Sequence, residues 1–347
     1  MSEDVPEREP DQLAGVPLPE FQRTLVGHVA AQQAMRARLD AGRLPGGVLI
    51  HGPQGIGKAT FAFDIAREIF ARTGDESPEH IAEQVAAGAY PNLRVLRKAP
   101  RDTGKGFYTV IRVEEVRDLV ERLHKTRGRA GHRIALIDAI DDCNASSANA
   151  LLKILEEPPA DSLFLLVSHR PGSLLPTIKS RCFQLALRPL SDGDLRQVLE
   201  RNRPDADPVA LDRAVGLAGG RPRRGFEALL MGDEGLLAGL KTWLADPARQ
   251  RPAAHLTMAE ALGAARDSAE LRFARDMLFA WLADEAKQAA IAGGRRRLAS
   301  AHELWEKAQL SFADADEYNL DMRQTLVAIF DAIRKHALTS AAVPEAT

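Results

Sequence analysis

A glycine-rich segment at residues 52–58, Gly-Pro-Gln-Gly-Ile-Gly-Lys, is the clearest candidate for chemistry in the sequence. It follows a short apolar run and opens a stretch with helical periodicity. In that setting Gly52, Gly55 and Gly57 let backbone N–H groups turn inward around phosphates, and Lys58 reaches the terminal phosphates. The segment therefore predicts a phosphate-binding loop (P-loop), with a plain glycine turn as the alternative.

The residue after the loop lysine departs from this pattern. A P-loop that binds Mg²⁺ has Ser or Thr there, whose hydroxyl ligates the metal, but this chain has Ala59. Thr60 comes one place late, and one residue along a helix is a rotation of about 100°. Its hydroxyl is therefore expected to point elsewhere. The backbone amides and Lys58 could still hold a nucleotide, but the metal would lose a ligand.

A second acidic motif shows a similar loss. The apolar run 134–138 ends in Asp138, as does the Walker B strand that carries a metal-associated carboxylate. An active ATPase normally has Glu next, and Ala139 can neither accept a proton nor orient water. Asp141 and Asp142 follow as weaker substitutes, and a helix cap or turn is the alternative role for Asp138. Because cleavage of a γ-phosphate needs both Mg²⁺ and an oriented nucleophile, the sequence predicts no hydrolysis at this site.

The elements that must position these residues alternate between strands and helices. Helices are expected at 58–73 and 144–157, and short apolar strands at 48–51, 93–96, 134–138, 163–168 and 182–187. This alternation predicts a parallel five-stranded sheet with helices on both faces. After Pro189 only helical patterns follow, and their apolar stripes predict a helical core, with a partner surface as the alternative.

Composition limits the class of protein. The 347 residues are 45% hydrophobic and 27% charged with a net charge of −2, which is typical of a soluble chain of two or three domains. No run of about 18 apolar residues and no signal peptide is found, so no membrane association is expected. Two cysteines cannot form a disulfide framework, which favours a reduced cytoplasmic protein. Strong DNA binding by overall charge is not expected.

Three basic clusters are either solvated faces or contacts to DNA phosphates. Aromatic residues are not interleaved with them, so base stacking is not indicated. The clusters are Arg94, Arg97, Lys98, Arg101 and Lys105; Arg122, Lys125, Arg127, Arg129 and Arg133; and Arg295, Arg296 and Arg297.

Two further motifs are more specific. The segments NALLKILEEPP at 149–159 and TIKSRC at 177–182 resemble the clamp-loader branch of the AAA+ ATPases. The departures at Ala59 and Ala139, together with GRLP at 42–45, resemble the members of that branch that lack their own ATPase activity. The resemblance covers about residues 21–230, and the helical C-terminus matches in general character.

The resemblance implies a domain organisation. A flexible tail at 1–20 would precede an AAA+ P-loop α/β domain at 21–188. A small helical lid at 189–232 and an all-helical collar, or oligomerisation, domain at 233–340 would follow, with a tail at 341–347.

The resemblance also implies roles for single residues. Arg181 of the Ser-Arg-Cys motif would be an arginine finger that acts in trans on a neighbouring subunit's ATP site. Ser168 would be the sensor-1 residue, with His169 an ordinary loop histidine. Arg223 would be the sensor-2 residue, with a solvated basic turn as the alternative. ATP binding would be weak or absent. No zinc is expected, because residues 74–107 lack the cysteines that many relatives carry there.

The function implied is that of a scaffold without ATPase activity of its own in a DNA polymerase III holoenzyme. The partners would be the other clamp-loader subunits (gamma/tau and delta) in a hetero-pentameric ring, with the sliding clamp and primer–template DNA reached through the complex. The alternatives are an active AAA+ motor, of the gamma/tau or branch-migration type, and a P-loop small-molecule kinase. Ala59 and Ala139 argue against the motor, and the Ser-Arg-Cys motif argues against the kinase.

Overall fold

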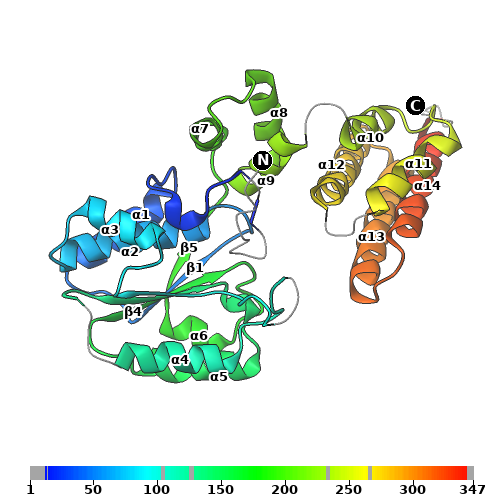
Figure 1. The fold of residues 1–347 in the computed structure, drawn as a ribbon. Coiled ribbons are helices and arrows are strands. Elements are labelled where there is room, and N and C mark those ends of the chain that lie inside the picture. The colour runs from blue at the N-terminus through cyan, green and yellow to red at the C-terminus, as the bar shows by residue number, and fades with distance from the viewer. Residues whose placement is uncertain are drawn as a thin grey trace. The chain divides into compact units, whose positions relative to one another are not determined.

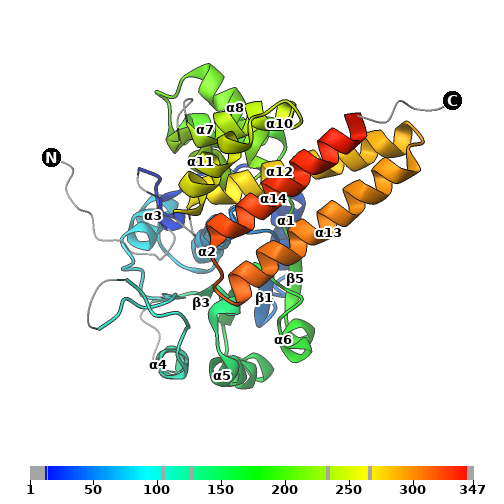
Figure 2. The same ribbon diagram turned by 90° about the vertical axis from the view of Figure 1, so that its right-hand side faces the viewer.

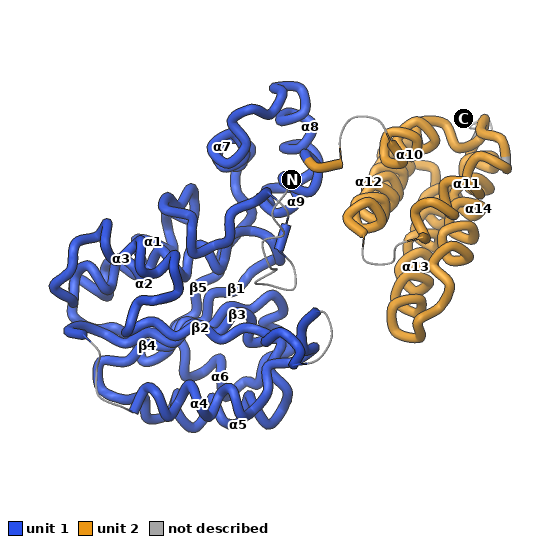
Figure 3. The backbone as a smooth tube through the Cα atoms, in the orientation of Figure 1, with its two compact units in different colours: residues 1–229 blue, residues 230–347 orange. Residues whose placement is uncertain are grey.

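The computed structural model describes residues 12–13, 15–102, 106–124, 129–231, 235–264 and 268–341. The chain divides into two compact units, residues 1–229 and residues 230–347 (Figure 3). Each unit is described by itself.

The first unit is built on a five-stranded parallel sheet with the strand order β2-β3-β4-β1-β5. Its strands are mostly continuous apolar runs, because a parallel sheet is buried on both faces. The strands are β1 (Gly47–His51), β2 (Leu93–Leu96), β3 (Arg133–Asp138), β4 (Ser162–Ser168) and β5 (Phe183–Ala186).

Helices cover both faces of this sheet (Figure 1). One face carries α1 (Val29–Asp40), α2 (Lys58–Thr73) and α3 (Pro78–Ala86), and the other carries α4 (Val113–His124), α5 (Ala145–Glu156) and α6 (Pro176–Arg181). Two short 3-10 helices, η1 (Pro19–Phe21) and η2 (Ile140–Asp142), complete this part. Successive strand residues point to opposite faces, so Val48 and Ile50 join one core and Leu49 the other.

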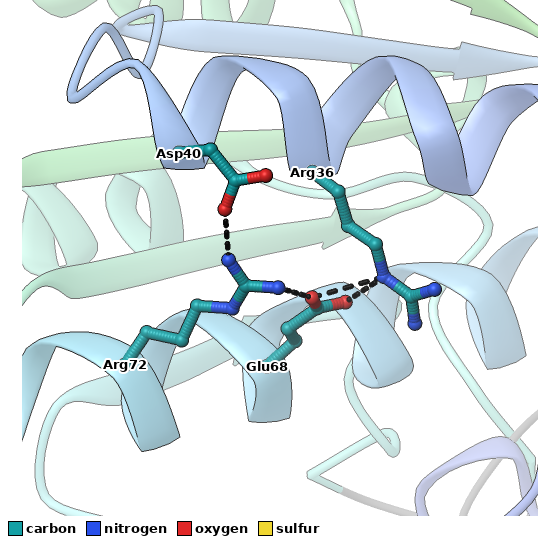
Figure 4. Close-up of polar contacts among 4 residues, drawn as sticks. All are labelled: Arg36, Asp40, Glu68 and Arg72. Atoms are coloured by element: carbon teal, nitrogen blue, oxygen red, sulfur yellow. Dashed lines mark hydrogen bonds and ion pairs between the residues drawn. The ribbon is translucent and has the colours of Figure 1, made fainter.

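An ion-pair network joins α1 to α2 on the surface (Figure 4). Arg36 contacts Glu68 at 3.0 Å, and Arg72 contacts both Glu68, at 2.7 Å, and Asp40. Because Arg36, Arg72 and Asp40 are exposed, each pair contributes at most about 1 kcal/mol to stability. The network aligns two helices that are already packed on the sheet.

Three short helices end the first unit: α7 (Asp192–Asn202), α8 (Pro208–Ala218) and α9 (Pro222–Leu230). The turn before α9 needs glycine, since Gly220 has a φ of +71° and a β-carbon there would lie 2.5 Å from the Leu190 carbonyl oxygen. The Leu190 N–H also donates to the Gly220 carbonyl at 2.8 Å. These contacts fix the start of α7 against the start of α9.

The second unit consists of helices throughout the part that the structure describes. They are α10 (Leu236–Ala245), α11 (Pro252–Gly263), α12 (Ala269–Ile291), α13 (Arg295–Glu317) and α14 (Met322–Ala341). The long helices α13 and α14 lie side by side (Figure 2). Trp243, Leu278 and Phe330 are buried in the hydrophobic core that the helices of the second unit share, as the apolar stripes predict.

The predicted fold class is confirmed, with small differences at the ends of elements. Cys182 lies just outside β5, and Asn144 is the N-cap of α5, where its side chain accepts a hydrogen bond from the Ser147 N–H. The flexible tail at 1–20 stays a prediction; of its residues, Leu18 and Glu20 are buried.

The predicted domain boundary at 188–189 stays a prediction, because helices α7 to α9 and the sheet belong to the same compact unit. The boundary at 232–233 and nearly all of the predicted C-terminal tail lie outside the described residues. No helix of the described part is long and apolar enough to span a bilayer.

Candidate functional site

The glycine-rich loop connects the end of β1 to the start of α2, as a P-loop should. Gly52, Gly55 and Gly57 have φ values of +150°, +80° and +95°, which favour glycine. A β-carbon on Gly52 would lie 2.4 Å from the Leu187 carbonyl oxygen. His28, at the N-cap of α1, donates its Nε2–H to the Ile56 carbonyl at 3.0 Å. The loop is thus held in place from both sides.

Lys58 is the first residue of α2, and its side chain folds back onto the loop. Only 3% of the residue is exposed, and Nζ donates to the carbonyl oxygens of Gly52 at 2.8 Å and Pro53 at 2.7 Å. Burial lowers the pKa of the Lys58 ammonium to about 8, although Asp138 and Asp141 raise it. The loop's own carbonyls therefore hold the ammonium group that would otherwise contact phosphate.

The lowered pKa of Lys58 predicts a pH-dependent contribution to stability. Between pH 8 and 10.5 the unfolded chain keeps the Lys58 proton more tightly than the folded chain, so this residue's contribution to the free energy of unfolding rises with pH in that window. The free energies of unfolding of wild type and Lys58→Met, measured with denaturant, should therefore have different pH dependences. The difference between the two free energies should change by a few kcal/mol between pH 8 and 10.5. Parallel pH profiles of the two proteins would contradict this expectation.

A cavity of about 670 Å³ lies in front of the P-loop. Most of the predicted site residues line it, namely Gly55, Gly57, Lys58, Ala59, Thr60, Asp138 and Arg223. Gly52 and Ser168 are not among its lining residues. Among the described residues, the charged lining comprises Lys58, Arg97, Lys98, Arg170, Arg201, Arg223, Asp138, Asp141 and Asp142. This excess of cations suits a phosphate-bearing ligand.

Ala59 places a methyl group where a metal-binding P-loop has a hydroxyl. Thr60 lines the same cavity, one residue further along α2. The direction of its hydroxyl stays a prediction.

The carboxylates near Ala139 are engaged by other groups of the chain. Asp138, at the end of β3, lies 3.5 Å from the Nε of Arg97, and Asp142 pairs with Lys98 at 3.1 Å. Asp141 accepts hydrogen bonds from the Ser168 hydroxyl at 3.0 Å and from the backbone N–H groups of His169 and Arg170 at 2.5 and 3.1 Å.

These bonds give Asp141 a structural task. Its two carboxylate oxygens fix the end of β4 against η2. Because both oxygens already accept hydrogen bonds, Asp141 is a poor substitute for the glutamate that orients water in an active ATPase. Ser168, the predicted sensor-1 residue, is fully buried and is one of the groups that hold Asp141.

Arg223 brings α9 to the P-loop. Its backbone N–H donates to the Gly55 carbonyl at 3.2 Å, and its Nε donates to the buried Glu227 at 3.1 Å. A β-carbon on Gly55 would lie 2.9 Å from the Arg223 β-carbon. Of the three neighbouring arginines, 221, 223 and 224, Arg223 is the one that lines the described cavity. Its position is that of the predicted sensor-2 residue, and the role stays a prediction.

Arg181 lies at the other end of the sheet. A β-carbon on Gly47, the first residue of β1, would lie 3.8 Å from the Arg181 carbonyl oxygen. The P-loop starts five residues further along the chain, and at about 3.3 Å per residue that is roughly 16 Å of strand. The Arg181 guanidinium contacts Glu156 at 2.7 Å and the Thr177 carbonyl at 3.1 Å, on a surface of α5 and α6. Arg181 therefore lies near the start of β1, at the opposite end of this strand from the glycine-rich loop.

Within the described residues, no group of three or more His, Cys, Asp or Glu side chains is arranged to hold a metal ion. Cys143 and Cys182 are free thiols. Burial raises the pKa of Cys143 to about 12 and that of Cys182 to about 11, so neither is a reactive thiolate.

Several of the basic residues singled out in the sequence form ion pairs. Arg122 pairs with Asp118, Arg129 with Glu76, and Arg297 with Glu285, beside the pairs of Arg97 and Lys98. Lys105, Lys125 and Arg127 lie outside the described residues. The pairs of Arg122, Arg129 and Arg297 favour the interpretation of their clusters as solvated faces, whereas Arg97 and Lys98 line the cavity in front of the P-loop.

Comparison with known proteins shows what part of the first unit is similar to them. Residues 27–191 match the family model described as DNA polymerase III, delta subunit. Over 178 residues the chain is 38% identical to the DNA polymerase III subunit delta′ of Pseudomonas aeruginosa, a match that covers 50% of this chain and 52% of that protein. Over the matched residues the chain is similar to delta-prime subunits. The predicted resemblance is confirmed.

Two further relatives are similar to this chain. The delta′ subunit of Yersinia pestis is 32% identical over 183 residues, covering 50% of this chain and 52% of that protein. The subunit tau of Escherichia coli is 30% identical over 223 residues, covering 62% of this chain and 33% of that protein. The chain spans about half the length of the delta-prime relatives it matches.

Proposed function

We propose that this chain is a delta-prime-like subunit of a DNA polymerase III clamp loader, without ATPase activity of its own. The similarity to delta-prime subunits supports this assignment. One observation carries the mechanism. The P-loop, where Ala59 and Ala139 stand in place of the hydroxyl and the glutamate, lies at one end of the parallel strands, and Arg181 lies at the other end.

The chain's own site can hold phosphate but is poorly equipped to cleave it. The backbone amides of the P-loop and the N-terminus of α2 attract phosphate oxygens. Ala59 offers no ligand to Mg²⁺, Ala139 offers no base, and Asp141 is bound to Ser168 and two backbone N–H groups. Nucleotide binding is accordingly weak or absent in the proposal.

The arginine edge is the part that acts on a neighbour. Arg181 is a third exposed, and its planar guanidinium can bind two phosphate oxygens of an adjacent subunit's nucleotide. An arginine supplied in trans stabilises the charge that develops on the transferred phosphoryl group. In the proposal Arg181 completes that site, and the subunit itself need not turn over.

The proposed setting is a replicative assembly. The partners would be the gamma/tau and delta subunits of a hetero-pentameric ring, which loads the sliding clamp on primed DNA in the cytoplasm. Co-purification with endogenous partners, followed by mass measurement of the intact assembly, tests this setting. A monomer or a homohexamer would count against it.

The isolated chain is expected to show negligible ATP hydrolysis, because neither Mg²⁺ nor the attacking water is held at its P-loop. The measurement is steady-state phosphate release by the purified protein, with and without primed DNA. Robust turnover by the chain alone would favour the active motor, of the gamma/tau or branch-migration type, instead.

Restoring both missing groups should still leave the isolated chain inactive. The double variant Ala59→Thr with Ala139→Glu regains a hydroxyl and a carboxylate, but Arg181 lies at the far edge and no neighbour supplies a finger. Phosphate release by the purified double variant is the measurement, with the wild-type chain as the control. Turnover by the lone variant would show that the site is self-sufficient.

A further inference from the structure

Magnesium does not fit the residues present at this P-loop. Enzymes with a P-loop hold the ion through the hydroxyl that follows the loop lysine and through the aspartate at the end of the Walker B strand. Here the hydroxyl is absent at Ala59. The remaining carboxylate, Asp138, is 15% exposed and faces the side chain of Arg97, whose Nε lies 3.5 Å from its Oδ2.

Arg97 is built into the site rather than placed loosely on its surface. It follows β2 directly, its side chain is 15% exposed, and its guanidinium lies 5.5 Å from the centre of the Phe63 ring. Its two terminal nitrogens donate to the two carboxylate oxygens of Glu20 at 3.2 and 3.1 Å. This bidentate geometry is the strongest form of arginine–carboxylate pairing.

Glu20 comes from a segment that lines the same cavity as the P-loop. It lies in η1 and is 9% exposed, and its neighbours Pro19 and Gln22 contribute to the lining. Arg67 of α2 donates to the Gln22 carbonyl at 2.8 Å, which holds the same segment. The Arg97 guanidinium thus lies between two carboxylates that come from distant parts of the chain.

We propose that Arg97 takes the place of the magnesium ion, as a permanent internal cation between Asp138 and Glu20. A cation in this position occupies carboxylate oxygens that a divalent ion would need and offsets one of their two negative charges. The cavity then accepts phosphate groups through its other cations, such as Lys58, Arg170 and Arg201, and no divalent cation takes part. The inference rests on this geometry and does not depend on the clamp-loader assignment.

The test is Mn²⁺ binding to the full chain and to Arg97→Met, which keeps the bulk of the side chain and removes its charge. Wild type should bind no Mn²⁺ in the millimolar range by electron paramagnetic resonance of the free ion. Arg97→Met removes the arginine charge that two mostly buried carboxylates share, so it should unfold at a lower temperature. Added Mn²⁺ should raise that temperature measurably, because the ion replaces the lost charge.

Two variants act as controls. Arg97→Lys keeps a cation and should behave like wild type towards Mn²⁺. Arg36→Met removes an exposed partner of Glu68 and should gain no response to the ion. A folded Arg97→Met that ignores Mn²⁺ would overturn the proposal.

If Arg97→Met does not fold, the wild-type chain decides the question. Mn²⁺ binding by wild type that disappears in Asp138→Asn would show a working metal site and overturn the proposal. No Mn²⁺ binding by wild type, together with normal folding of Arg97→Lys, would support it.

Discussion

Replacing Arg181 by alanine is expected to lower ATP hydrolysis by about 10³-fold at the one site of a reconstituted clamp loader that this arginine serves, since arginine fingers contribute about 10³–10⁵ in rate. The fold should be retained. Arg181 is partly exposed and its pair with Glu156 is a surface contact, so its loss costs at most about 1 kcal/mol. The measurement is phosphate release by the assembled complex, with assembly checked by its mass.

Two companion variants separate the finger from general effects of charge. Lys179→Ala removes a neighbouring cation of α6 and should leave the rate nearly unchanged. Arg181→Lys keeps the charge but loses the planar fork, and it should fall between alanine and wild type. If the assembled complex with Arg181→Ala hydrolyses ATP at the wild-type rate, the finger assignment must be abandoned.

Replacing Phe164 by alanine is expected to destabilise the first unit by about 3–5 kcal/mol, the usual cost of removing a phenyl ring from a core. Phe164 is fully buried in β4, which pairs with β1 on one side and β3 on the other. The cavity left behind would border the strands that end in the candidate site. Denaturant unfolding followed by far-ultraviolet circular dichroism measures the loss.

The distribution of tryptophans makes this measurement specific. All three tryptophans, Trp243, Trp281 and Trp305, lie in the second unit. Their fluorescence therefore reports that unit, while circular dichroism reports both. Phe164→Ala should shift the dichroism transition more than the fluorescence transition. Phe21→Ala is the control: this residue is 45% exposed, so the substitution should shift neither the dichroism nor the fluorescence transition. Equal dichroism midpoints for Phe164→Ala and wild type would contradict the predicted core.

The parts of the fold that could be predicted from the sequence are those with a local signature. Apolar runs such as 134–138 and 163–168 became central strands because burial on both faces requires an unbroken apolar segment. The spacing of the glycines placed the P-loop, and Asn144 and the proline pair at 158–159 marked the ends of α5. The strand order was not accessible, because it depends on contacts between segments far apart in the chain.

The candidate site was predictable only where one motif contained it. Arg97 and Glu20 are 77 residues apart, and no periodicity or spacing in either segment indicates that they meet. Arg97 appeared in the sequence as one member of a basic cluster. Asp141 was a possible substitute for the missing glutamate, and its hydrogen bonds to the end of β4 became visible only in three dimensions. The catalytic and sensor roles of Arg181, Ser168 and Arg223 stay predictions.

The positions of Arg181 and the P-loop also give each chain a direction. Donor and acceptor lie at opposite ends of the same parallel strands, so a contact that brings one to the other joins unlike surfaces. Unlike surfaces make head-to-tail arrays, not two-fold symmetric pairs. If Arg181 acts as proposed and the P-loop of this chain does not hydrolyse ATP, the chain gains no activity from a neighbour on its P-loop side. The proposed function therefore places this chain at one end of such an array.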